Sequence, residues 1–87
     1  MLPPKAMPAH FPSRLRMLRL QHGLTQEQMS ERAEVSLKHL QRLESGSNMN
    51  PSLLLLVRLA AAINVPLYEL LYSPKDLLVE LLERSDF

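Results

Sequence analysis

Residues 24–46 read LTQEQMSERAEVSLKHLQRLESG, and this stretch decides the fold. Thr25, followed three residues later by Gln28, matches a capping box, in which each side chain satisfies a backbone N–H of the other residue at the start of a helix. Met29 and Ala33 lie four residues apart, so they share one helical face and are expected to be buried. The pattern predicts a short helix that ends at about Ala33.

A second helix is expected after a turn at residues 34–35. Ser36 is suited to cap its start, because a serine hydroxyl accepts a hydrogen bond from an otherwise unpaired backbone N–H. Gly46 is suited to end it, because glycine adopts the left-handed conformation without a steric penalty. The helix between them covers residues 37–45. Two helices joined by such a turn form a helix-turn-helix, which places its second helix in the major groove of DNA.

The second helix carries a polar stripe on its outer face. Leu37 and Gln41 lie four residues apart, as do Lys38 and Arg42, so the four side chains share one side of the helix. Arg or Lys donates to guanine O6 and N7, Gln pairs with adenine, and an apolar side chain contacts the thymine methyl. The stripe therefore suits base reading. An ordinary solvated helix face is the alternative, and for Leu37 so is a structural contact.

The rest of the chain also has helical patterns. We expect helices over residues 13–22, over residues 52–63 with a start at Asn50-Pro51, and over residues 66–71. The predicted core consists of inward-facing residues: Leu15, Leu18, Met29, Val35, Leu40, Leu43, Leu56, Ala60, Ile63 and Leu70. Leu53 is expected on the same face as Leu56. The predicted fold is all-α, a compact bundle of five short helices with a C-terminal sixth.

Two segments flank the domain, which is expected over residues 13–72. Residues 1–12 hold four prolines and are expected to form an extended arm. Residues 73–87 are expected to form an amphipathic helix whose leucine stripe either packs on the core or forms a dimer seam. The amount of apolar surface favours the seam. The residues assigned to this dimer interface are Leu54, Leu55, Tyr68, Tyr72, Leu78 and Leu82.

Composition excludes several classes of protein. The 87 residues fit one domain, and there is no cysteine, which removes disulfides and thiolate metal sites and suits a reducing cytosol. No apolar run is long enough to span a bilayer, and the first residues lack a signal peptide, so a cytoplasmic protein is expected. The three histidines share no metal-ligand spacing. No cofactor, metal, small-molecule ligand or enzyme activity is expected.

Charge is distributed unevenly although the net charge is only +1. Residues 1–46 carry seven basic and four acidic side chains, whereas residues 47–87 carry three basic and five acidic ones. A basic half suits an anionic partner. A chance imbalance between two solvated surfaces explains the numbers equally well.

Residues 14–71 resemble the DNA-binding domains of the Cro and phage-repressor type, also called the lambda-repressor-like or XRE family. The resemblance is carried by LTQE at residues 24–27, VS at 35–36, E-S-G at 44–46 and PSL at 51–53. It implies that Gln26 grips a phosphate and braces the recognition helix, and that Ser36 contacts the DNA backbone. It also implies base reading by Leu37, Lys38, Gln41 and Arg42, a phosphate-facing loop with Ser47 and Asn48, and a structural ion pair between Arg19 and Glu44.

The chain departs from the family pattern in the turn, in the loop after Gly46, and at Leu54, Leu55 and Ala61, which are apolar where relatives are usually polar. Glu34 stands where relatives often have glycine, which implies backbone strain if its φ is positive. The loop after Gly46 has no Lys or Arg, so Ser47, Asn48 and backbone amides would have to meet the phosphates. This departure implies weak affinity and a shallow dependence on salt.

The expected function is sequence-specific binding of double-stranded DNA for transcriptional control. We expect a small homodimeric repressor or autoregulator that uses the helix over residues 37–45 on a palindromic operator, with no membrane partner. The alternative is a protein-interaction module, such as an antitoxin or a complex partner, that keeps the fold but binds DNA weakly. The loop without basic residues and the extra leucines favour this alternative.

Overall fold

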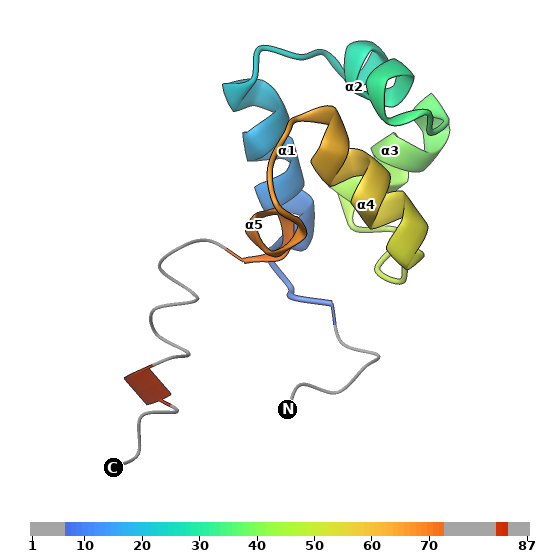
Figure 1. Cartoon of the computed structure of the whole chain (residues 1–87). Helices are drawn as coiled ribbons and strands as arrows, with labels where there is room; N and C mark the ends of the chain where they lie inside the picture. Colours follow the sequence, from blue (N-terminus) through green and yellow to red (C-terminus); the bar gives the residue numbers. More distant parts are fainter. Residues whose placement is uncertain (1–6, 73–81, 84–87) are drawn as a thin grey trace.

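The computed structural model describes residues 7–72 and 82–83. Its helices are α1 (Phe11–Gln21), α2 (Gln26–Ala33), α3 (Leu37–Ser45), α4 (Leu53–Ala62) and α5 (Leu67–Leu71). Figure 1 shows α2 at the end of the domain farthest from α5, with α4 lying against α2 and α5 and with α1 against α3 and α5. The described residues contain no strand, which confirms the all-α prediction. None of their helices has the length and apolar character that a membrane crossing needs.

The starts of α2 and α3 follow from local capping. Gln28 N donates to Thr25 Oγ1 at 3.1 Å, and Thr25 N donates to Gln28 Oε1 at 2.9 Å, so the predicted capping box is present. Ser36 Oγ accepts a hydrogen bond from His39 N at 3.0 Å. Because both caps act on neighbouring backbone groups, the bounds of these two helices are set by the sequence around them.

The turn between α2 and α3 contains a left-handed residue. Glu34 has φ 56° and ψ 42°, a conformation that costs about 1–2 kcal/mol for a residue with a Cβ atom. Val35 N donates to Ser30 O at 3.0 Å and closes the turn. The strain that the sequence analysis attached to a positive φ at Glu34 is therefore present.

The core is a single cluster to which α1 to α5 all contribute, together with Leu24 ahead of α2 and Ile63 just after α4. Its members are Phe11, Leu15, Leu18, Leu24, Met29, Ala33, Leu40, Leu43, Leu55, Leu56, Leu59, Ala60, Ile63 and Leu70. All the predicted core residues belong to it except Val35, which is partly buried and packs against it. Four members were not predicted, namely Phe11, Leu24, Leu55 and Leu59. The core holds α3 against α1 and α2, which sets the position of its outer face.

α1 and α4 start at other residues than predicted, and α5 starts one residue later than predicted. α1 begins at Phe11, which is fully buried, and Pro12 is tolerated in its first turn because no intrahelical N–H is needed there. The last two residues of the arm predicted over residues 1–12 are therefore helical. α4 is capped by Ser52, whose Oγ accepts from Leu55 N at 3.1 Å, and not by Asn50. With this start, Leu53 is 66% exposed, contrary to the prediction.

Half of the predicted arm and nearly all of the predicted C-terminal helix lie outside the described residues. Residues 1–6 of the predicted arm are among the residues not described. The same holds for the predicted sixth helix over residues 73–87, apart from Leu82 and Glu83.

The beginning of α1 is tied to the end of α5. His10 Nε2 lies 3.0 Å from Leu71 O, and Arg14 Nε donates to Glu69 O at 3.0 Å. Arg14 is buried in this position. Because the last carbonyls of a helix have no intrahelical partner, these two side chains satisfy acceptors that would otherwise lack one.

Candidate nucleic-acid interface

The outer face of α3 presents polar side chains that the domain itself does not use. Lys38, Gln41 and Arg42 are exposed, and none of these side chains has a hydrogen-bond or ion-pair partner in the described part of the chain. Leu37, at the start of the stripe, is half-buried. The donors on this face are therefore available to an external partner.

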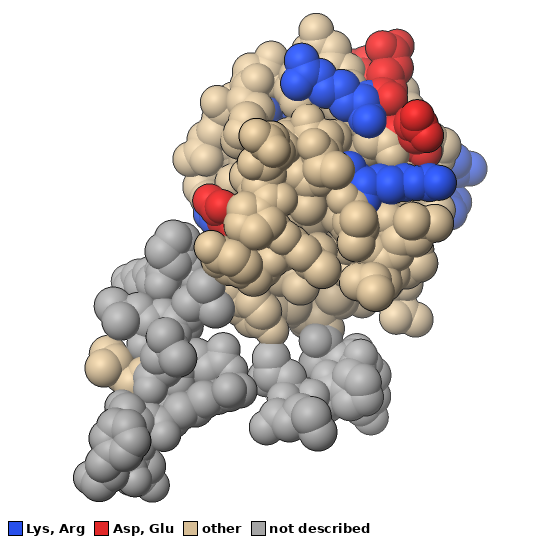
Figure 2. Space-filling view, in the orientation of Figure 1, with Lys and Arg blue, Asp and Glu red and all other residues tan. Residues whose placement is uncertain are grey.

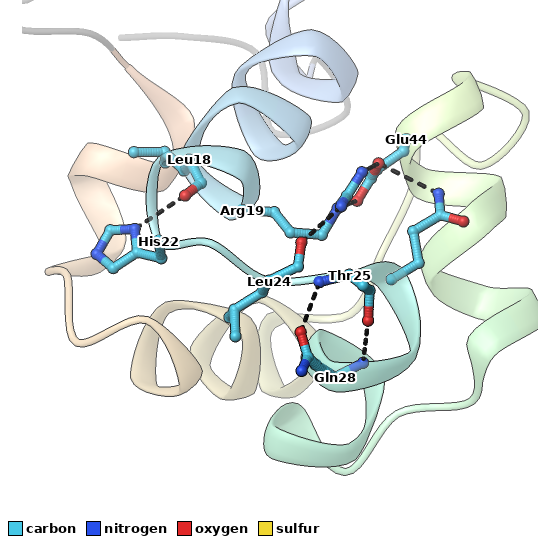
Figure 3. Close-up of polar contacts among 8 residues, drawn as sticks. Leu18, Arg19, His22, Leu24, Thr25, Gln28 and Glu44 are labelled. Atoms are coloured by element: carbon cyan, nitrogen blue, oxygen red, sulfur yellow. Dashed lines mark hydrogen bonds and ion pairs between the residues drawn. The ribbon is translucent and has the colours of Figure 1, made fainter.

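A buried ion pair fixes α3 relative to α1 (Figure 3). Arg19 Nε donates to Glu44 Oε2 at 2.7 Å, and Arg19 Nη2 donates to Glu44 Oε1 at 3.0 Å. Arg19 Nη1 also donates to Leu24 O at 2.8 Å, and the two charged side chains are only 8% and 5% exposed. A bidentate arginine–carboxylate pair has a defined geometry, so the end of α3 is held in one place.

Gln26 connects the start of α2 to the same ion pair. Its Nε2 donates to Glu44 Oε1 at 3.3 Å, and the residue is half-buried. This contact links the start of α2 to the end of α3. The phosphate contact of Gln26 stays a prediction.

A groove of about 550 Å³ lies along one flank of α3, and we call it the first groove. Arg16, Gln26, Gln41 and Ser45 are among its lining residues. Arg16 is exposed and has no partner among the residues described. The helix that contains Arg16 has several similar arginines, so its sequence does not indicate which of them lies beside α3.

A second groove, of about 380 Å³, lies on the opposite flank of α3. It is bounded by the turn before α3, the loop after α3 and the first turns of α4. Its polar lining residues are Glu34, Ser36, His39, Asn48, Asn50, Ser52 and Arg58. Sequence reasoning did not select Arg58, since only the folded chain brings α4 next to the start of α3.

Comparison with known protein families identifies this arrangement. A family model described as helix-turn-helix matches residues 15–70. The chain belongs to this helix-turn-helix family. The match covers the helices α2 and α3 together with most of their supporting core, and it confirms the family resemblance found in the sequence.

Two solved structures are similar to this helix-turn-helix chain. One is the restriction-modification controller protein C.AhdI from Aeromonas hydrophila, with 33% identity, a TM-score of 0.66, and coverage of 69% of this chain and 89% of that one. The other is the hypothetical transcription factor NHTF from Neisseria, with 25% identity, a TM-score of 0.74 and coverage of 92% of both chains. A comparison with curated proteins finds no match.

The polar side chains of the loop after α3 form hydrogen bonds within the loop and with the end of α3. Ser47 Oγ donates to Arg42 O at 3.4 Å, and Asn48 Oδ1 accepts from Asn50 N at 3.0 Å. Ser47 is exposed and Asn48 is half-buried. Ser36 is exposed and caps α3, so its predicted contact with the DNA backbone would add to that role.

The residues assigned to a dimer interface fall into different environments. Leu54 is 58% and Tyr68 is 56% exposed, but Leu55 is 7% exposed and belongs to the core. Tyr72 is half-buried, Leu82 is exposed, and Leu78 lies outside the described residues. Leu53 and Val57 extend the apolar surface of α4. Figure 2 shows a broad uncharged area over the lower part of the domain, whereas most of the charged side chains lie at the upper right, towards α2.

The described residues give no sign of a metal site. No three of their His, Asp and Glu side chains are placed to hold a metal ion together. Two of the three histidines instead lie close to main-chain carbonyls, His10 near Leu71 O and His22 with Nδ1 2.8 Å from Leu18 O.

Proposed function

We propose that the chain is a transcriptional regulator that binds double-stranded DNA in a sequence-specific way and inserts α3 into the major groove. The observation that carries this proposal is the exposed stripe of Lys38, Gln41 and Arg42, whose donors are unpaired on a helix that the core and an ion pair hold in place. Rigid presentation of such donors is what reading base edges requires.

Membership of the helix-turn-helix family supports the proposal. So do the two similar structures, which are described as a controller protein of a restriction-modification system and as a transcription factor. The distribution of cations adds further support. Arg16, Lys38, Arg42 and Arg58 are all exposed and lie on α3 or line one of the grooves beside it.

Removing Lys38 or Arg42 from the outer face of α3 should change which DNA sequences the protein prefers. We expect Arg42→Ala and Lys38→Ala each to cost about 1–3 kcal/mol per half-site and to relax base preference at the positions they contact. Selection of bound sequences from a random DNA pool, followed by titration of the variants, measures both effects. Unchanged base preference in both variants would show that α3 does not contact base edges.

Gln26→Ala is the matched comparison, because a phosphate contact positions the protein without specifying sequence. It should weaken binding to the selected site and to unrelated DNA by the same factor. Thermal unfolding of this variant separates the loss of the phosphate contact from the loss of the hydrogen bond to Glu44.

We also propose that the regulator is a homodimer with a palindromic operator. One recognition helix reads too few base pairs for a genome, whereas two helices about 34 Å apart read two successive major grooves. The exposed apolar side chains Leu53, Val57 and Tyr68 support an interface over α4 and α5, to which the leucines of residues 73–87 would contribute, whereas Leu54 lines the second groove.

Charging the C-terminal stripe should separate the two subunits. Leu78→Glu combined with Leu82→Glu is expected to give a folded monomer, because two buried carboxylates facing their copies are costly to desolvate. Sedimentation velocity and circular dichroism check the two parts of this expectation. A parent protein that sediments as a monomer at high concentration would contradict the dimer.

A protein-interaction module that binds DNA weakly is the second candidate. The exposed apolar side chains of α4 and α5 and the loop without basic residues favour it. Polarisation titrations with genomic fragments at two salt concentrations separate the candidates. A sequence-specific regulator binds one fragment much more tightly than the others at both salt concentrations, whereas a module of this kind binds every fragment weakly.

A further inference from the structure

We propose that the second groove holds the DNA backbone that faces it across the major groove from Gln26, and that Arg58 is the side chain that binds its phosphates. This inference rests on the proposed function. It assigns a DNA contact to α4. The helix-turn-helix itself comprises α2 and α3, and the predicted base-reading residues all lie on α3.

The position of the groove is the first argument. A helix in the major groove lies between the two phosphate backbones, so each of its flanks faces one of them. Gln41 and Ser45 of α3 line the first groove, whereas Ser36 and His39 line the second. If Gln26 meets one backbone, the second groove meets the other.

The chemistry of Arg58 is the second argument. The residue is exposed and lines the groove, and its guanidinium has no hydrogen-bond or ion-pair partner among the residues described. Guanidinium is the side chain best matched to phosphate, because its planar donors bind two oxygens at once. His39 and the two asparagines of the loop lie in the same lining and supply further donors.

The loop after α3 explains why α4 supplies the cation. Residues 46–52 contain no Lys or Arg, and the side chain of Asn48 accepts a hydrogen bond from the loop itself. A basic residue on the adjacent helix replaces the missing loop cation without adding length to the loop. Arg58 follows the capping Ser52 by six positions, on the exposed side of α4.

One carboxylate is expected to weaken phosphate binding in this groove, so its removal tests the direction of the predicted electrostatic effect. Glu34 is exposed and lines the same groove as Arg58. Its negative charge repels a phosphate bound there. Removal of that charge should therefore strengthen DNA binding, whereas removal of Arg58 should weaken it.

The experiment measures affinity for the selected site and for an unrelated duplex between 50 and 200 mM salt. Loss of one phosphate contact lowers the slope of log K against log salt by about one. For Arg58→Gln, the ratio of the affinities at the two salt concentrations should therefore fall about 3.5-fold on both duplexes, with base preference unchanged. Arg58→Lys should keep the slope, and Glu34→Gln should raise affinity on both duplexes.

Arg32→Gln is the matched control, since Arg32 is an exposed arginine of α2 that lines neither groove. Equal slopes for Arg58→Gln and Arg32→Gln would overturn the inference, and the proposed function would stand if Arg42→Ala still changed base preference. If the parent protein showed no salt-dependent binding to any duplex, both this inference and the proposed function would be overturned.

Discussion

Glu44→Ala is expected to lower the free energy of unfolding by about 3–5 kcal/mol, the usual cost of removing one partner from a buried ion pair. The Arg19 side chain is 8% exposed, and without Glu44 its one remaining acceptor among the described residues is Leu24 O. A guanidinium cannot lose its charge to escape this environment. Urea denaturation with an unchanged m-value measures the loss.

A double variant separates the cost of the unpaired charge from the contribution of the pair. Arg19→Met with Glu44→Leu removes both charges and keeps apolar volume, so it should recover most of the stability lost in Glu44→Ala. It should still bind DNA less well, because the hydrogen bonds that orient the end of α3 are gone. A loss below about 1 kcal/mol in the single variant would show that water reaches Arg19.

Leu40→Ala is expected to cost about 2–5 kcal/mol through the cavity that it leaves. Leu40 is fully buried, and it packs α3 against the core beneath the exposed residues Lys38, Gln41 and Arg42. Leu37→Ala is the control from the same helix, and its cost should be smaller because Leu37 is half-buried. Thermal unfolding compares the two. An unchanged melting temperature for Leu40→Ala would mean that this face of α3 is not packed.

Local sequence rules predict the helix-turn-helix better than they predict the helices around it. The caps at Thr25 and Ser36 act through hydrogen bonds within three residues, so the bounds of α2 and α3 follow from short segments. The start of α4 offers two competing caps, Asn50 before Pro51 and Ser52 after it. Which of them acts depends on how α4 docks, and that is a property of the whole core.

The run LLLL at residues 53–56 shows the same limit. Four consecutive leucines have no periodicity, so the sequence alone does not indicate which of them face inward. In the structure Leu55 and Leu56 are buried, whereas Leu53 and Leu54 are exposed. The sequence therefore could not show that Leu55, which was assigned to a dimer surface, belongs to the core.

The predicted base-reading residues of α3 could be selected from the sequence, whereas the cations of the neighbouring helices could not. Lys38 and Arg42 could be selected from their spacing, because both lie on one helix. Arg16 and Arg58 could not, since they come from helices that only tertiary packing places beside α3. Among the arginines of α1, burial and hydrogen bonding distinguish Arg16 from Arg14 and Arg19.

The contact between His10 and Leu71 has a consequence for how such a domain can be combined with others. His10 Nε2 lies 3.0 Å from Leu71 O, so the residue before α1 meets the last residue of α5, at the end of the domain away from α2. Domains whose ends lie close together accept circular permutation and insertion into other chains. This helix-turn-helix could therefore be grafted as a cassette into a surface loop of an unrelated protein, with its DNA-facing end pointing outward.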